Sequence, residues 1–161
     1  MPDAPLLFRA HSLKYLQGPT GIIANPNLTR DRHPRDMPPP VHAAIRQWFI
    51  ERFGVDYRGA ALFCTGDKTI AAGYKNNNNA IISLFPIGPF SVCYSPKCKD
   101  LYGHYLFQWS KADNPATLAT TELDNLDFIH RPNGGIQEAV ASGHEIMIFA
   151  EKFHYKIVEG K

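Results

Sequence analysis

The sequence has no long hydrophobic run, and its first residues, Met1 to Pro5, carry no basic segment leading into one. A membrane-spanning helix needs about 20 consecutive apolar residues, and a secretory signal peptide needs a basic segment followed by about 7–15 apolar residues. We therefore expect neither a transmembrane helix nor a signal peptide, and no membrane among the partners of this chain.

Cysteine is scarce, and the three in the chain are Cys64, Cys93 and Cys98. An odd count argues against a disulfide framework and indicates a reducing compartment, which here predicts the cytoplasm. Cys93 and Cys98 lie near His104 in the sequence, but a structural zinc site needs four ligands at tighter spacing. We therefore expect no metal.

An excess of either charge is also missing. The chain has 17 Lys and Arg residues and 15 Asp and Glu residues, which gives a net charge of +2. Such weak basicity allows an anionic ligand or a nucleic acid but demands neither. Arg30, Arg32 and Arg35 could meet phosphates, although a solvated charge run explains them more simply.

Length and composition predict one domain covering 1–161. The hydrophobic content of 44% is ordinary for a globular protein. A chain near 150 residues buries about 68–70% of its unfolded surface, so its core needs no metal or disulfide support.

Hydrophobic periodicity predicts helices in the middle of the chain. Apolar residues recur every three or four positions over 40–53, which indicates an amphipathic helix that stops at Gly54. Asp67 is placed to cap a short helix that runs to Tyr74, and a third helix is predicted at 136–141.

Strands are predicted towards both ends of the chain, at 6–10, 60–65, 80–85, 90–94, 145–150 and 153–158. Pro86 to Pro89 and the pair Glu151-Lys152 are predicted as turns, 18–40 as a loop and 111–133 as irregular. Residues 104–109 are predicted as a strand or part of a helix, with Trp109 in the core. Strands at both ends with helices between them indicate the α+β class.

Three segments, in order, resemble the mono-ADP-ribosyltransferase toxins. Leu7 to Ser12 resembles the first strand of the cholera-toxin-like branch, an aromatic residue followed by arginine. Leu62 to Lys68, with Ala71 to Tyr74 after it, is similar to that fold's aromatic-Ser-Thr strand and the helix that follows. The diphtheria-toxin branch also has a stretch ending in Ala-Ala-Gly-Tyr. Glu145 to Ile148, followed by Tyr155 to Val158, resembles the strand pair that begins with the family's catalytic glutamate.

The resemblance covers about a quarter of the chain, and it implies both a fold and an activity. The fold would be a single ADP-ribosyltransferase-like domain, with a split β-sheet core and flanking helices. The activity would be that of a toxin or effector that moves ADP-ribose from the co-substrate NAD to a protein or nucleic acid and releases nicotinamide. Its partners would include a neutralising antitoxin. It would act in the cytoplasm of a bacterial or phage-infected cell, or in the cytosol of a target cell.

Glu145 is the candidate catalytic carboxylate by this resemblance. Loss of nicotinamide leaves an oxocarbenium-like ribose, as in glycoside hydrolysis. A carboxylate near the ribose stabilises that charge and accepts a hydrogen bond from the 2′-hydroxyl. The alternative is a surface glutamate beside a turn.

Arg9 is the second candidate catalytic residue and a contact of NAD. A guanidinium binds phosphate or ribose oxygens through two parallel hydrogen bonds, and a charge inside an apolar strand needs a partner. The alternative is an edge strand in which Arg9 points to water. Ala10 and His11 on the same segment are further NAD contacts by the resemblance. His11 leaves the choice between the Arg-type and His-type branches open.

The nicotinamide would occupy an aromatic slot formed by Phe63 and Tyr74. Thr65 would hold the corner between strand and helix through its hydroxyl, and Cys64 would replace the family's first serine. Phe63 could equally be plain core, and a buried Cys64 is commonly inert.

The sequence departs from the family in two places. Cys64-Thr65-Gly66 replaces Ser-Thr-Ser, and Gly143 stands where many members have Gln or Glu. The second departure leaves the acceptor chemistry open, and His144 could act as a base or orient the ribose. A nuclease-type toxin, a non-catalytic binder of the same fold and a simple NAD hydrolase are alternatives.

Overall fold

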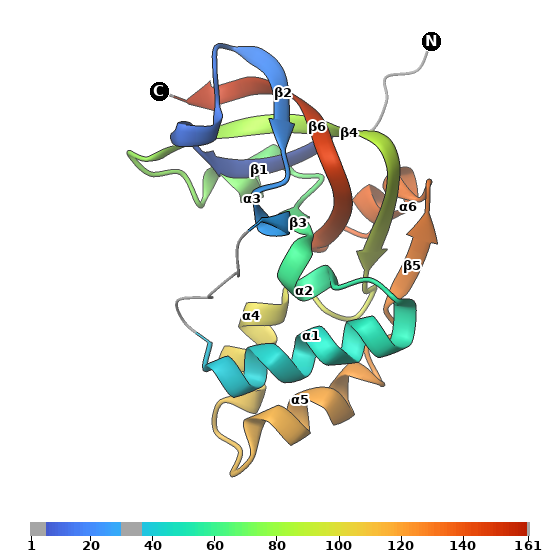
Figure 1. Ribbon diagram of the computed structural model, residues 1–161. Coiled ribbons are helices and arrows are strands. Elements are labelled where there is room, and N and C mark those ends of the chain that lie inside the picture. Colours follow the sequence, from blue (N-terminus) through green and yellow to red (C-terminus); the bar gives the residue numbers. More distant parts are fainter. Residues whose placement is uncertain (1–5, 30–36, 161) are drawn as a thin grey trace.

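Two long antiparallel strands, β4 (Asn79–Tyr94) and β6 (Ile146–Gly160), run side by side through the sheet (Figure 1). They belong to a computed structural model that describes residues 6–29 and 37–160. The two hairpins predicted from the sequence are wrong, because each is one continuous strand. A register shift between Ile87 and Phe90 bends β4 without ending it, as a β-bulge does. Lys152 pairs with both Ile87 and Ala24, and this pairing keeps β6 extended where a turn was predicted.

Shorter strands pair with β4 and β6 along each half of their length, and all the pairings are antiparallel. In one half, β1 (Leu7–Ser12) pairs with β4, and β2 (Thr20–Ala24) pairs with β6. In the other half, β5 (Ile129–Pro132) pairs with β4, and β3 (Leu62–Cys64) pairs with β6. The described part of the chain thus forms a bent six-stranded sheet accompanied by six α-helices. The predicted mixture of helices and strands is confirmed.

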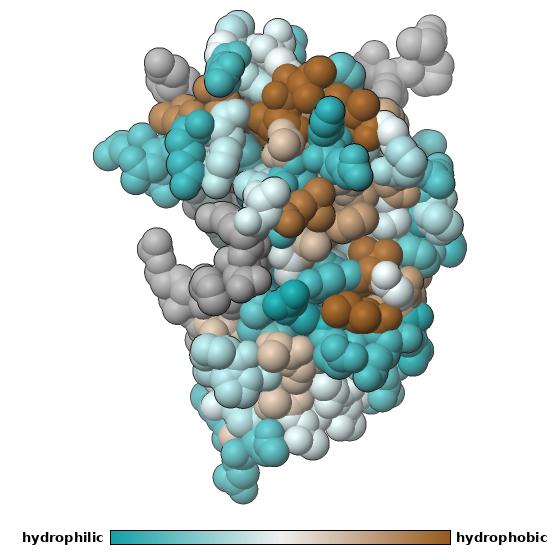
Figure 2. Space-filling model, viewed as in Figure 1, coloured by the Kyte–Doolittle hydropathy of each residue, from teal (hydrophilic) through white to brown (hydrophobic). Residues whose placement is uncertain are grey.

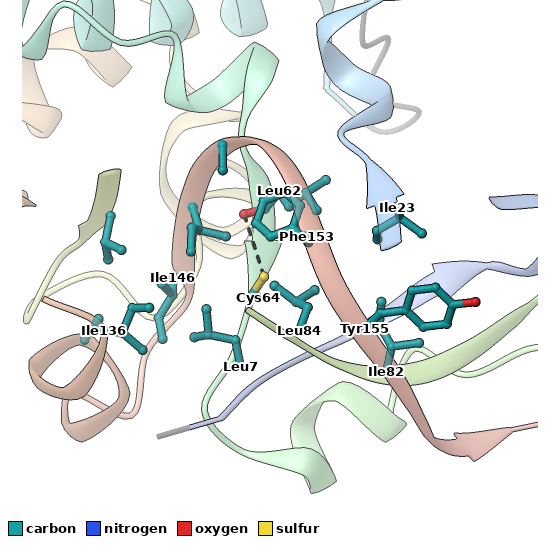
Figure 3. Close-up of a cluster of buried hydrophobic side chains, with 14 of the residues drawn as sticks. Leu7, Ile23, Leu62, Cys64, Ile82, Leu84, Ile136, Ile146, Phe153 and Tyr155 are labelled. Carbon is teal, nitrogen blue, oxygen red and sulfur yellow. Dashed lines mark hydrogen bonds between the residues drawn. The ribbon is translucent and has the colours of Figure 1, made fainter. Parts of the chain in front are cut away.

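The first hydrophobic core lies where β3 closes back onto β1. The backbones of Phe8 and Thr65 exchange two hydrogen bonds of 2.8 and 2.9 Å, so β1, β4, β6 and β3 are joined in a ring. Leu7, Cys64 and Ile146 point towards one another inside it, from three of these strands (Figure 3). Helix α6 (Ile136–Ala141) covers this cluster at one end, and its bounds match those predicted.

The second core lies between the sheet and two helices, α1 (Pro39–Phe53) and α5 (Pro115–Leu123), which pack side by side (Figure 1). Helix α1 confirms the predicted helix at 40–53, and it ends at Gly54 in the left-handed conformation with φ +75°. Phe49 and Trp109 are fully buried here, which confirms the predicted core position of Trp109.

Several short elements escaped the prediction. Strand β2 lies in the segment predicted as a loop, and α5 and β5 lie in the segment predicted as irregular. Residues 104–109 are helical, which is one of the two predicted alternatives. Arg30, Arg32 and Arg35 lie outside the described residues. The remaining elements are the helices α2 (Tyr57–Ala60), α3 (Lys68–Ala72) and α4 (Leu101–His104), the 3₁₀ turns Leu13–Tyr15 and Pro26–Leu28, and the π-helical turn Tyr105–Trp109.

One face of the half-sheet that contains β2 is turned to solvent. Figure 2 shows apolar side chains gathered over this part of the molecule. Ile22 and Phe85 are 60% and 46% exposed, and both lie directly opposite the exposed His154 of β6. Residues directly opposite one another on neighbouring strands share a face of the sheet. This half-sheet therefore buries its other face in the first core.

Candidate functional site

A cleft of about 720 Å³ opens beside the junction of β1 and β3. Its volume falls in the range of about 300–1,000 Å³ that is usual for sites of small molecules and cofactors. Seven of the eight site residues predicted from the sequence line this one cleft, namely Arg9, Ala10, Phe63, Cys64, Thr65, Tyr74 and Glu145. Segments that lie far apart in the sequence thus meet at one place. His11 does not line the cleft.

Arg9 is held from two sides at the junction of β1 and β3. Its Nη1 donates a hydrogen bond to the carbonyl oxygen of Phe63 at 3.0 Å, and its Nε donates to Nδ1 of His11 at 3.0 Å. The side chain is half-buried and lines the cleft. The guanidinium is therefore anchored to the strand beside it instead of extending into bulk water.

His11 lies behind Arg9 and is 3% exposed. Because its Nδ1 accepts the hydrogen bond from Arg9, the ring orients the guanidinium. The ring centroid of Tyr15 is 5.5 Å from that of His11. The structure thus brings both candidate residues of β1 together, with Arg9 towards the cleft and His11 as its support. The predicted contact between His11 and NAD stays a prediction.

The corner between β3 and α3 is held by the predicted polar side chains. The Thr65 hydroxyl accepts a hydrogen bond from the Asp67 backbone N–H at 3.1 Å. The Asp67 carboxylate caps α3 by accepting from the N–H groups of Thr69 and Ile70. The predicted roles of Thr65 and Asp67 at this corner are confirmed, although α3 ends at Ala72 and not at Tyr74.

Packing against α6 favours glycine at position 66, at the same corner. A Cβ atom added there would lie 2.6 Å from Cγ1 of Val140, far inside van der Waals contact. A side chain at position 66 would therefore collide with α6 unless Val140 moved.

Cys64 is buried, and its thiol faces the first core, 3.9 Å from the carbonyl oxygen of Leu62 (Figure 3). Burial raises the pKa of the Cys64 thiol to about 12, although the positive charge of Arg9 opposes this. A thiol with such a pKa stays protonated at neutral pH, and the thiolate is the nucleophilic form. Cys64 therefore contributes to the packing of the first core.

Glu145 lies immediately before β6, which begins one residue later than predicted. Its backbone N–H donates to the carbonyl oxygen of Lys99 at 2.9 Å. Its Oε1 accepts a hydrogen bond from the backbone N–H of Leu101 at 3.2 Å. The side chain is half-buried and lines the cleft, so Glu145 is not a fully exposed surface residue.

Arg58 of α2 was missed from the sequence, although it lines the same cleft and is 3% exposed. Its Nε donates to Nδ1 of His42 at 3.3 Å, and its guanidinium carbon lies 5.3 Å from the ring centroid of Phe63. Burial lowers the pKa of Arg58, and the negative charge of Glu145 opposes this shift. The available signal was a lone arginine shortly before a predicted apolar strand, whereas Arg9 lies inside one. No local pattern connects Arg58 to Glu145.

The aromatic residues predicted for the nicotinamide slot differ in their surroundings. Phe63 lines the cleft and also packs against the second core, so its two predicted roles are compatible. Tyr74 is 67% exposed at the rim. Burial, followed by the negative charges of Asp100 and Glu145, raises the pKa of the Tyr74 hydroxyl. The rim of the cleft therefore carries an amphipathic ring close to two carboxylates.

Among the side chains that the structure describes, no cluster of three or more His, Cys, Asp or Glu is arranged to hold a metal ion. Residues 6–29 and 37–160 contain no helix long and apolar enough to cross a membrane. No family model, curated protein or solved structure matches the chain.

Proposed function

We propose that this chain is an NAD-dependent mono-ADP-ribosyltransferase of the toxin or effector type. It transfers ADP-ribose from NAD to a macromolecular acceptor, protein or nucleic acid, and releases nicotinamide. The observation that carries the proposal is the convergence of Arg9, Phe63 and Glu145 on one cleft of cofactor size. These residues come from the three segments that resemble the family, and each segment belongs to a different strand or strand end.

The charges that line the cleft suit the parts of NAD. Arg9, Arg58 and Lys99 are cationic, and a diphosphate is recognised by such groups. Glu145 supplies a carboxylate for the ribose as its bond to nicotinamide breaks. Because nicotinamide leaves as a neutral molecule, no acid is needed at the leaving group. The reaction therefore depends on positioning and on charge.

The fold gives secondary support. Two half-sheets share β4 and β6, which agrees with the split sheet implied by the sequence resemblance. The half-sheets meet near the bulge in β4, and Glu145 lies at the start of β6. A carboxylate adjoining a strand is held more firmly than one in a long loop.

The test is incubation of the protein with NAD labelled in its adenylate half and a cell extract, with nicotinamide release and label transfer measured together. Glu145→Gln should lower both by at least about 100-fold, because the amide lacks the charge that stabilises the transition state. The amide oxygen can still accept the hydrogen bond from Leu101, so the fold should persist. Glu151→Gln is the matched control, since Glu151 is an exposed residue of β6 outside the cleft.

Two results would overturn the proposal: wild-type protein that releases no nicotinamide and transfers no label, or a Glu145→Gln variant as active as Glu151→Gln. RNA cleavage without NAD would indicate a nuclease instead. Digestion of the labelled product with protease or with nuclease identifies the acceptor class.

A further inference from the structure

His144 lines the cleft beside Glu145, and a carbonyl group fixes its ring. Its Nδ1 lies 2.8 Å from the carbonyl oxygen of Ser95, and its backbone N–H donates to the Ser142 hydroxyl at 3.1 Å. Ser95 is 1% exposed, and its own hydroxyl donates to the carbonyl oxygen of Leu126. The ring is therefore held by a rigid, buried part of the chain.

This contact decides which nitrogen of His144 carries the proton. A carbonyl oxygen only accepts hydrogen bonds, so Nδ1 must be the donor. In the neutral ring, Nε2 is then the acceptor. Within the described part of the chain, no hydrogen bond engages Nε2. His144 thus presents a base at the wall of the cleft.

Three other residues that line the cleft are engaged or unsuitable as bases. Gly143, two residues before Glu145, has no side chain and adopts φ +73°. The Asp100 carboxylate caps α4 by accepting from the Gly103 N–H at 2.5 Å. The Cys64 thiol stays protonated because burial raises its pKa. His144 is therefore the group best placed to receive a proton.

We propose that His144 is the general base that activates a hydroxyl acceptor for ADP-ribose. The proposal rests on the proposed function and adds the chemical class of the acceptor atom. The bond between C1′ of the ribose and nicotinamide breaks, and its electron pair leaves with nicotinamide. The acceptor oxygen forms a bond to C1′, and its proton passes to Nε2 of His144 and then to solvent. A neutral imidazole suits a neutral hydroxyl, which must lose a proton to become part of a glycoside.

The experiment places two small acceptors in competition for NAD, methanol and azide. Methanol must lose a proton, whereas azide is an anion with none to lose. His144→Asn is the variant, because its amide nitrogen can still donate to the Ser95 carbonyl while Nε2 is removed. His154→Asn is the matched control, since His154 is exposed on β6 outside the cleft. The ratio of methyl-ADP-ribose to ADP-ribosyl azide is read by chromatography.

The ratio should fall by about 100-fold or more in His144→Asn, the usual contribution of general base catalysis, and should not change in His154→Asn. The ratio comes from active molecules alone, so partial loss of folded protein does not alter it. If His144→Asn does not fold, His144→Gln replaces it in the same competition. An unchanged ratio, which includes equal loss of both products, would overturn the role of His144 as the base. The transferase proposal would still stand in that case if the wild type releases nicotinamide. A wild type that releases no nicotinamide overturns both.

Discussion

Asn25 ties three segments of the chain together, and its removal should be costly. The side chain is 2% exposed and follows β2 directly. Its Nδ2 donates to the carbonyl oxygens of Ala60 at 2.7 Å and Ala150 at 3.1 Å, and its Oδ1 accepts from the Asn27 N–H at 2.9 Å. Asn25 thus joins β2 to the end of α2 and to the middle of β6.

Asn25→Ala should lower the free energy of unfolding by about 3 kcal/mol. The carbonyl of Ala150 loses a buried hydrogen bond. A buried polar group left without a hydrogen bond lowers the free energy of unfolding by about 1–3 kcal/mol. The other two hydrogen bonds are partly buried and contribute about 0.5–1.5 kcal/mol each. The loss is a large fraction of the roughly 5–15 kcal/mol that stabilises a domain.

Urea unfolding followed by circular dichroism measures the effect. With a denaturant slope of about 2 kcal/mol per molar urea, the midpoint should fall by roughly 1.5 M. Asn77→Ala, at an exposed turn residue, is the control and should stay within about 0.5 kcal/mol of the wild type. A loss below about 1 kcal/mol in Asn25→Ala would refute the account of these three hydrogen bonds.

Three further outcomes are expected. Gly66→Ala should lower the free energy of unfolding in urea by about 1–3 kcal/mol, because the added Cβ collides with Val140. Adding Val140→Ala should recover part of this loss. A double variant no more stable than Gly66→Ala would contradict the explanation. Arg58→Met should weaken NAD binding by about 10–150-fold in calorimetry, since a hydrogen bond to a charged group contributes about 1.5–3 kcal/mol. It should also lower stability by about 1–3 kcal/mol, because it removes the hydrogen bond that Arg58 donates to buried His42. Undiminished NAD affinity would remove Arg58 from the site. Burial, followed by the charge of Arg131, lowers the pKa of His130. The unfolded state therefore binds a proton at this ring more readily than the folded state does. The free energy of unfolding should fall as the pH drops below 6.5, the ordinary pKa of histidine. His130→Gln should make that fall shallower in urea titrations at several pH values, and an equally steep fall would exclude His130 as its source.

The end of α1 and the cap of α3 depend on groups within a few residues, and both were predicted correctly. The helix that became α1 ends at Gly54, where glycine takes a positive φ that other residues rarely adopt. Asp67 caps α3 through N–H groups two and three residues ahead. Such features depend on local backbone geometry, so the sequence around them was enough.

The continuity of β4 and β6 depended on distant partners. Gly88 and the pair Glu151-Lys152 look like turns because turn propensity is a local property. Pairing of Lys152 with Ala24 and with Ile87 keeps this part of β6 extended. Long-range strand pairing overrode the local preference there, and no sequence window of a few residues contains it.

By itself, the sequence determined the mixed fold class, the helices α1, α3 and α6, and the nomination of Arg9 and Glu145 through their motifs. Tertiary structure alone decided that these residues meet in one cleft, that Arg58 joins them, and that the Ser95 carbonyl selects the proton-bearing nitrogen of His144. The physical reason is that a buried charge or ring takes its role from groups that surround it in space. Chain folding brings those groups together from segments tens of residues apart.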